Sequence, residues 1–215
     1  MKIKWLGHSC FLVTSKAGLK IITDPYTPGG IVRYAKIKES ADVVTVSHEH
    51  GDHNALSFVS GKPEVVRIAG LKDIKGIKVN GISCFHDDIS GRQRGANIVF
   101  CFKVDDIIIC HLGDLGHRLS TAQIDDIGKV DLLMIPVGGN YTIDAKVATL
   151  VCNDLKPKVI FPMHYKTPRI DYPISGVDVF LKNKKNVRRL DSSEVEIRKE
   201  TLPKETEIVV LQSEY

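Results

Sequence analysis

The chain has 215 residues, of which 43% are hydrophobic and 26% are charged, and its formal net charge is +4. This composition excludes a disordered chain and predicts one globular domain over residues 1–215 with a substantial core. No apolar run approaches the roughly 20 residues that span a bilayer, and the first residues lack the pattern of a secretion signal. We therefore expect a cytoplasmic protein without a membrane span.

Five cysteines lie far apart in the chain and include no CxxC pair: Cys10, Cys84, Cys101, Cys110 and Cys152. Such spacing predicts reduced thiols that pack as small hydrophobic residues in a reducing compartment. Concentrated positive charge occurs in KNKKNVRR at 182–189, which we interpret as a solvated helix end and loop. Nucleic-acid binding is therefore not expected, whereas the mild positive charge is compatible with an anionic small molecule.

The pattern of apolar residues predicts sheets covered by helices. Strands are predicted over residues 2–7, 10–14, 19–24, 41–47, 64–69, 77–86, 97–104, 106–114, 131–139, 158–165, 187–190, 194–198 and 207–212. Helices are predicted over 52–60, opened by Asp52, and over 120–128 and 144–155. Because helices occur in both halves, a bare β-sandwich and a regularly alternating barrel are both disfavoured.

Several predicted strands stop at a histidine or a carboxylate. These residues are Asp24, His48, His86, Asp114 and His164. Loops at one edge of a sheet are where binding and catalytic groups gather. The recurrence therefore predicts a functional site at such an edge.

The densest group of polar residues is SHEHGDHNAL at 47–56. His48 and His50 are two residues apart, so both side chains point the same way in extended backbone. Gly51 permits a tight turn before Asp52 and His53. Imidazole nitrogens and carboxylate oxygens are ligands that zinc and similar divalent ions prefer. A metal site is therefore predicted here.

The available ligands outnumber the needs of one ion. The candidates can be sorted by which side chains are able to reach a common ion. One site is then completed by His48, His50 and His86, and the other by Asp52, His53 and His164. Asp114 is expected to bridge the two. Two ions about 3.5–4 Å apart can share a water and lower its pKa toward roughly 7, which makes a metal-bound hydroxide available at neutral pH. This is the apparatus of a hydrolase.

The same residues carry a family resemblance. In their order, Asp24, the His48-x-His50-x-Asp52-His53 motif, His86, Asp114 and His164 resemble the metallo-β-lactamase-fold hydrolases. The segments LGHSCF, ITDP, HDDISGRQRGANIVF and HLGDLGH are similar to the branch that includes ascorbate-phosphate lactonases. The resemblance runs from residue 3 to about residue 165. It implies an α+β fold, a four-layer αββα sandwich of two mixed β-sheets covered by helices, with a dinuclear site at one edge.

The resemblance also implies a choice of chemistry. Diiron oxygen-reducing relatives carry a carboxylate at the position of His50, so a histidine there favours a hydrolytic site. We expect two divalent ions, zinc in the first place, with manganese or iron as alternatives. In this family the residue matching Asp24 orients ligands without binding metal, although an Asp-Pro turn explains Asp24 equally well on sequence alone.

Further residues near the motifs have two interpretations each. Asp52 is expected to accept a proton from the attacking water in addition to binding metal. His8 is either a substrate contact or proton donor, or a packed histidine. His111 either supports a ligand from behind or is simply buried.

Two loops supply the remaining candidates. Tyr141 is placed to donate to a developing oxyanion, while Asp144 is expected to cap the following helix. Arg92 and Arg94 lie in the Gly-rich loop after His86 and are candidates to hold a phosphate. The alternative for both arginines is a solvated loop.

Together these observations predict a metal-dependent hydrolase of a small anionic ester, lactone or phosphodiester. Two alternatives stay open. One is a nuclease or RNA-processing phosphodiesterase, which is disfavoured because no basic and aromatic residues alternate along the chain. The other is a metal-binding regulatory module that no longer turns over substrate. A homo-oligomer is compatible with the short loops.

Overall fold

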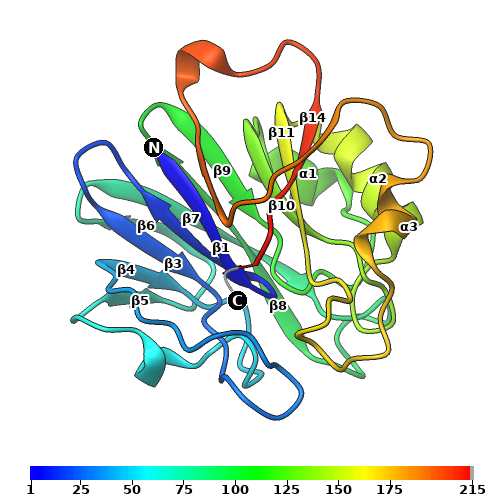
Figure 1. Cartoon of the computed structure of the whole chain (residues 1–215), viewed down its shortest axis with the longest axis horizontal. Helices are drawn as coiled ribbons and strands as arrows, with labels where there is room; N and C mark the ends of the chain where they lie inside the picture. Colours follow the sequence, from blue (N-terminus) through cyan, green and yellow to red (C-terminus); the bar gives the residue numbers. More distant parts are fainter. Residues whose placement is uncertain (214–215) are drawn as a thin grey trace.

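The computed structural model describes residues 1–213, which form two β-sheets packed face to face (Figure 1). The first sheet has, in order, β13 (Glu194–Glu196), β1 (Lys2–Gly7), β2 (Cys10–Thr14), β3 (Lys20–Thr23), β4 (Val43–Thr45) and β5 (Glu64–Val66). The second has β12 (Val187–Arg189), β14 (Glu207–Val210), β11 (Val159–Met163), β10 (Leu132–Pro136), β9 (Ile107–His111), β8 (Ala96–Val104), β7 (Ile77–Phe85) and β6 (Gly70–Ile74). Both contain parallel and antiparallel pairs, so the expected fold of two mixed sheets is confirmed.

The helices lie beside the second sheet (Figure 1). They are α1 (Thr121–Ile127), α2 (Ala145–Leu155) and α3 (Val177–Leu181). Ser120 begins α1 with a reciprocal capping box to Gln123, and Asp144 caps α2 by accepting from the Val147 amide at 2.8 Å. The predicted cap at Asp144 is therefore confirmed. No helix in residues 1–213 is long and apolar enough to cross a membrane.

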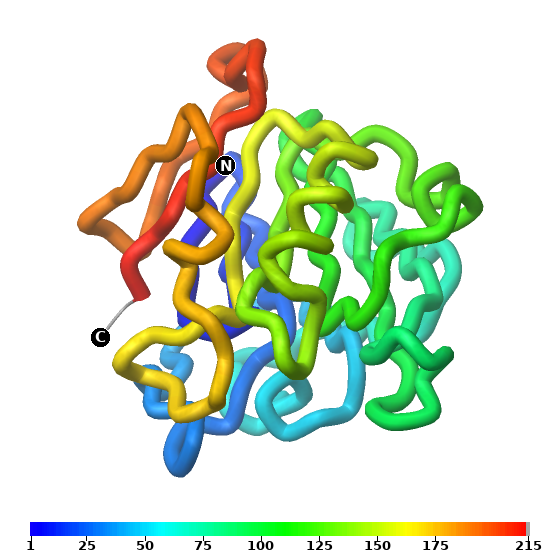
Figure 2. Tube along the Cα trace, turned by 90° about the vertical axis from the view of Figure 1, so that its right-hand side faces the viewer, coloured from blue at the N-terminus to red at the C-terminus, as the bar shows by residue number. Residues whose placement is uncertain are grey.

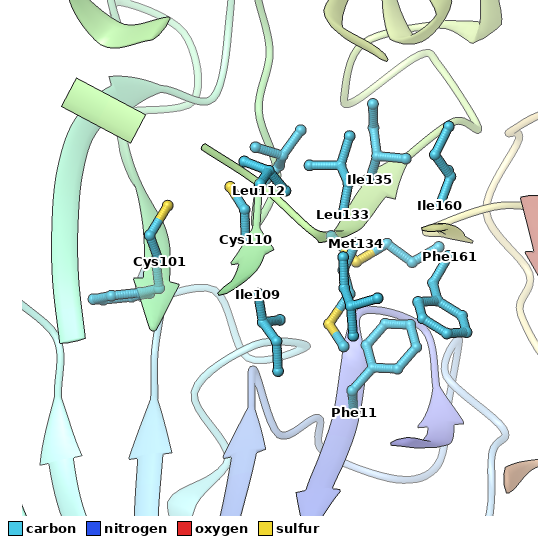
Figure 3. Packing of buried hydrophobic residues seen from close by; sticks show 14 of the residues in the cluster. Phe11, Cys101, Ile109, Cys110, Leu112, Leu133, Met134, Ile135, Ile160 and Phe161 are labelled. Carbon is cyan, nitrogen blue, oxygen red and sulfur yellow. The ribbon is translucent and has the colours of Figure 1, made fainter. Parts of the chain in front are cut away.

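The core lies between the sheets because strand residues alternate between two buried faces. On β2, Phe11 points into the core against Phe161 of β11, with ring centroids 6.3 Å apart, and Figure 3 shows the two rings beside Met134. Its neighbour Leu12 faces the other side and packs with Ile22 in a second cluster. Burying one such side chain stabilises the fold by about 1.5–3 kcal/mol. The first sheet is therefore packed on both faces and supports the loops at its end.

Loops cover most of the outer face of the first sheet. The predicted helix over 52–60 is wrong, and only a 3-10 turn forms, η1 (Leu56–Phe58). The His53 and Asn54 amides both donate to the His50 carbonyl, which closes a tight turn instead of starting a helix. The Asp52 carboxylate points into the site and does not cap a helix. Strand β6, helix α3 and the 3-10 turn η2 (Lys199–Thr201) were not expected from the sequence.

Strands that carry candidate residues run in the same direction within each sheet. In the first, β1 and β3 are antiparallel to β2, and β4 is parallel to β3. In the second, β7 and β9 are antiparallel to β8, and β10 and β11 continue parallel to β9. Their carboxyl ends therefore share an edge, which six candidates follow: His8, Asp24, His48, His86, Asp114 and His164. Figure 2 shows the loops after β4 (cyan) and β11 (yellow) at the same end of the molecule.

Candidate metal centre

Three groups of possible ligands lie at this edge, and within each group the ligand atoms lie within 4.8 Å of one another. The groups are His48, His50 and His86; His8, Asp52, His53 and His164; and Asp24, His48 and His53. The first matches one predicted site, and the second contains the other with His8 added. Residues more than 100 positions apart in the sequence are thus brought to one place.

Asp114 lies at the centre of these histidines. Its Oδ2 is 3.2 Å from Nε2 of His53, 3.2 Å from Nε2 of His164, 3.3 Å from Nε2 of His86 and 3.9 Å from Nε2 of His48. Burial disfavours the charged carboxylate, but the surrounding imidazoles outweigh burial and hold the pKa of Asp114 well below its usual range. The carboxylate is therefore ionised and available to bridge two cations.

A tight turn places Asp114 at this point. Its amide donates to Asn97 Oδ1 at 2.9 Å, and Gly113 before it has φ +55°. A side chain on Gly113 would collide with Asn97 and Ser47, so only glycine fits. His111 supports the same turn: Nε2 donates to the Ser9 carbonyl at 2.8 Å, and Nδ1 accepts from the Gly113 amide at 3.2 Å. The structure thus places His111 behind Asp114, bonded to backbone.

Asp24 sets the protonation pattern of two histidines. Its Oδ2 accepts from His53 Nδ1 at 2.9 Å and from the Ser47 hydroxyl at 2.5 Å. Because that hydroxyl donates to Asp24, its oxygen accepts from His48 Nδ1 at 2.9 Å. Both imidazoles therefore carry a proton on Nδ1 and turn Nε2 toward the site. Asp24 thus orients both histidines by hydrogen bonds, and its oxygens are already engaged.

The residues fit divalent metal ions. In the part of the chain that the structure describes, His48 Nε2, His53 Nε2 and Asp114 Oδ1 are buried without a hydrogen-bond partner. Leaving such atoms unpaired costs about 1–3 kcal/mol each. Imidazole nitrogens and an ionised carboxylate, converging on one space, are the donor set of a zinc-type ion. The cluster is therefore arranged for cations.

Asp52 is held by two side chains. Its Oδ2 accepts from the Tyr172 hydroxyl at 3.0 Å and from His8 Nε2 at 3.2 Å. Burial lowers the pKa of His8 to about 4, so its imidazole is neutral and donates this one proton to Asp52. His8 lies beneath Asp52 and is not among the residues that line the open hollow. The structure therefore assigns His8 to a contact with Asp52.

Sequence reasoning missed Tyr172. It lies in the loop between β11 and α3, which carries no recognisable motif. The one available signal was position, because this loop follows His164 and so begins at the edge where the other ligands meet.

Three residues of the site have left-handed backbone. His8, Asp24 and His164 have φ values of +53°, +39° and +49°, and each follows the end of a strand. Side chains with a Cβ rarely adopt this conformation, which costs about 1–3 kcal/mol per residue. Such strain concentrates at functional sites, where the direction of the side chain outweighs the energetic cost of the backbone conformation.

A hollow of ≈ 430 Å³ opens above the cluster. It is lined by His50, Asp52, His86, Arg94, Asp114, Tyr141, His164 and Tyr172. The ring of Tyr141 contacts that of Tyr172, with centroids 5.3 Å apart, and the Arg94 guanidinium lies 5.4 Å from the Tyr141 centroid. Arg92 is exposed, donates to the Ile89 carbonyl and does not reach the hollow. Arg94 therefore lines the hollow and Arg92 does not, although the sequence alone made them equal candidates.

Comparison with known proteins identifies the family. A family model described as a beta-lactamase superfamily domain matches residues 2–164. A UPF0173 metal-dependent hydrolase of Carboxydothermus hydrogenoformans is 32% identical, over 83% of this chain and 89% of that protein. The chain belongs to the UPF0173 metal-dependent hydrolase family. Another UPF0173 member, from Pelotomaculum thermopropionicum, is 30% identical over 78% of this chain and 85% of its own length.

A solved structure extends the UPF0173 assignment to the whole fold. A protein of Thermotoga maritima, classed as a Zn-dependent hydrolase of the metallo-beta-lactamase superfamily, superposes with a TM-score of 0.84. It is 40% identical and covers 99% of both chains. The predicted superfamily and fold are thus confirmed, and homology makes this UPF0173 protein a metal-dependent hydrolase. The finer resemblance to ascorbate-phosphate lactonases stays a prediction.

Proposed function

We propose that the protein hydrolyses a small anionic ester, lactone or phosphodiester with two divalent ions, zinc in the first place. One ion would be held by His48, His50 and His86, and the other by Asp52, His53 and His164, with Asp114 shared. The observation that carries the proposal is the Asp114 carboxylate, one oxygen of which lies 3.2–3.9 Å from four imidazole nitrogens at the floor of the hollow. When bound, such ions polarise a carbonyl or phosphoryl oxygen and acidify water.

The side chains of the hollow supply the remaining functions. Asp52 is ionised, lines the hollow and has its Oδ2 fixed by Tyr172 and His8, so it is placed to take a proton from an attacking water. The Tyr141 hydroxyl is placed to donate to charge that develops on the substrate oxygen. Asp24 and Ser47 keep the histidine tautomers fixed throughout.

Metal removal tests the proposal. We would assay the zinc-loaded protein against bis-p-nitrophenyl phosphate, simple lactones and phosphorylated sugar lactones. We expect turnover of at least one class that EDTA abolishes and that zinc or manganese restores, because the proposed reaction depends on the metal ions to polarise the substrate and to acidify water. Metal content is measured on the same samples by elemental analysis. Protein that carries two ions per chain and cleaves none of these substrates would contradict the proposal.

Tyr172→Phe tests the role given to Asp52. The change removes one of the two hydrogen bonds to Oδ2 and leaves the ring in place. A hydrogen bond to a charged group is worth about 1.5–3 kcal/mol, so we expect kcat to fall roughly 10-fold or more with unchanged zinc content. Steady-state kinetics measure the fall. Tyr34→Phe is the matched control, since its hydroxyl bonds to Thr167 and not to Asp52. Equal kinetics in the two variants would remove Tyr172 from the mechanism.

A further inference from the structure

We propose that Arg94 is an oxyanion subsite, which binds a carboxylate or phosphate that the substrate carries away from the bond to be cleaved. We infer in addition that the substrate continues past Arg94 into a second hollow. This inference rests on the proposed function, because it takes the metal-ligand cluster as the place where the bond is cleaved. To the proposed function it adds three properties of the substrate, namely its charge, the position of that charge and its shape.

The first step is that the charge of Arg94 is unneutralised. Most other arginines of the described chain pair with carboxylates, as Arg33 does with Asp171 and Arg118 with Asp154. Within residues 1–213, Arg94 pairs with no carboxylate; Nη1 donates to the Gln93 side chain at 3.1 Å, and the guanidinium lies over the Tyr141 ring. The bond to Gln93 engages Nη1, so the other N–H donors of the guanidinium are available to an oxyanion in a fork geometry.

The second step is that the backbone holds Arg94 in place before any ligand arrives. Asp87 follows the ligand His86, and its carboxylate accepts four backbone N–H bonds of 2.7–3.0 Å from the loop 89–94. One of these, at 2.7 Å, comes from the amide of Arg94 itself. The loop is thus tied directly to the residue after a metal ligand. Such preorganisation reduces the entropy that binding would otherwise lose.

The third step is that Arg94 lies between two hollows. A second hollow of ≈ 340 Å³ shares His50 and Arg94 with the one above the metal ligands. Its lining includes the apolar residues Val46 and Ile98, together with Glu49 and Arg67, which pair with each other at 3.4 Å. A ligand that reaches from the cluster past Arg94 therefore enters a partly apolar space. The substrate class that fits is an ester, lactone or phosphodiester with an oxyanion beside its reactive group and a further moiety beyond it.

Matched non-hydrolysable probes test the subsite without turnover. Methylphosphonate offers one group to the metal ions, phosphonoacetate adds a carboxylate, and methylenediphosphonate adds a second phosphonate. Calorimetry on zinc-loaded protein measures each Kd, with zinc retention checked by elemental analysis. We expect at least one of the longer probes to bind about 10-fold or more tightly than methylphosphonate. The probe with the larger gain identifies carboxylate or phosphate as the preferred group.

Two variants test whether Arg94 produces the tighter binding of the longer probes. In Arg94→Gln the longer probe should bind no more than about 2-fold more tightly than methylphosphonate. Arg92→Gln, which changes a residue on the same loop but outside the hollow, should retain the full difference in Kd. An advantage that persists in Arg94→Gln, or that is absent from the wild type, overturns the subsite. Failure of chelation-sensitive turnover would instead overturn the proposed function. The two ideas are therefore tested separately.

Discussion

Asp114→Asn leaves the protein with at most one zinc ion per chain, where the wild type is expected to hold two, and nearly abolishes turnover. The reason is that Asp114 Oδ2 lies 3.3–3.9 Å from histidines of one proposed site, His86 and His48, and 3.2 Å from those of the other, His53 and His164. An amide has the same shape but lacks the charge that attracts two cations. Loss of a residue that merely orients a ligand already weakens metal binding about 10–100-fold, so loss of the shared ligand should exceed that range.

Elemental analysis after dialysis against a defined zinc concentration measures the effect. Asp154→Asn is the matched control, because that carboxylate pairs with Arg118 at the surface and exposed ion pairs contribute little to stability. Circular dichroism verifies that both variants are folded. Two zinc ions retained by folded Asp114→Asn would refute the centre as described.

Asp52→Asn is expected to lower kcat by about 10²–10⁴-fold, even with zinc at saturating concentration. The amide keeps one oxygen directed at the site but cannot accept a proton from water. Saturating zinc compensates for weakened ligation, so a loss that persists measures the role of Asp52 as a base. Steady-state kinetics across a zinc titration separate the two roles.

Combining this change with Tyr172→Phe sharpens the test. If Tyr172 acts through Asp52, its removal should have little further effect in the Asp52→Asn background, because interacting residues are not additive. Zinc-saturated Asp52→Asn with a kcat within about 10-fold of the wild type would contradict the assignment.

The position of several candidates was predictable because they lie close behind the end of a strand. Short runs of apolar residues show where β4, β9 and β11 end, and the one to three residues that follow lie at the sheet edge. His48, Asp114 and His164 were accessible to this logic. The strand pattern therefore placed these candidates at one edge, while the name of the fold came from the family resemblance.

Other features depend on contacts that are remote in sequence. The Tyr172 hydroxyl reaches Asp52, which lies 120 residues earlier in the sequence. Arg94 differs from Arg92 because its amide donates to Asp87 and its guanidinium lies over the Tyr141 ring. The supposed helix at 52–60 failed because the site takes Asp52 away from the helix start. In each case a tertiary interaction overrides the local preference.

The left-handed backbone at the three strand ends has a consequence for engineering. Glycine adopts this conformation without a steric penalty, but at His8, Asp24 or His164 it would also remove a buried side chain and leave a cavity. At these positions it would delete a proposed ligand or the contact that orients one. A search for thermostable variants should therefore leave these three residues unchanged and seek stability elsewhere in the fold.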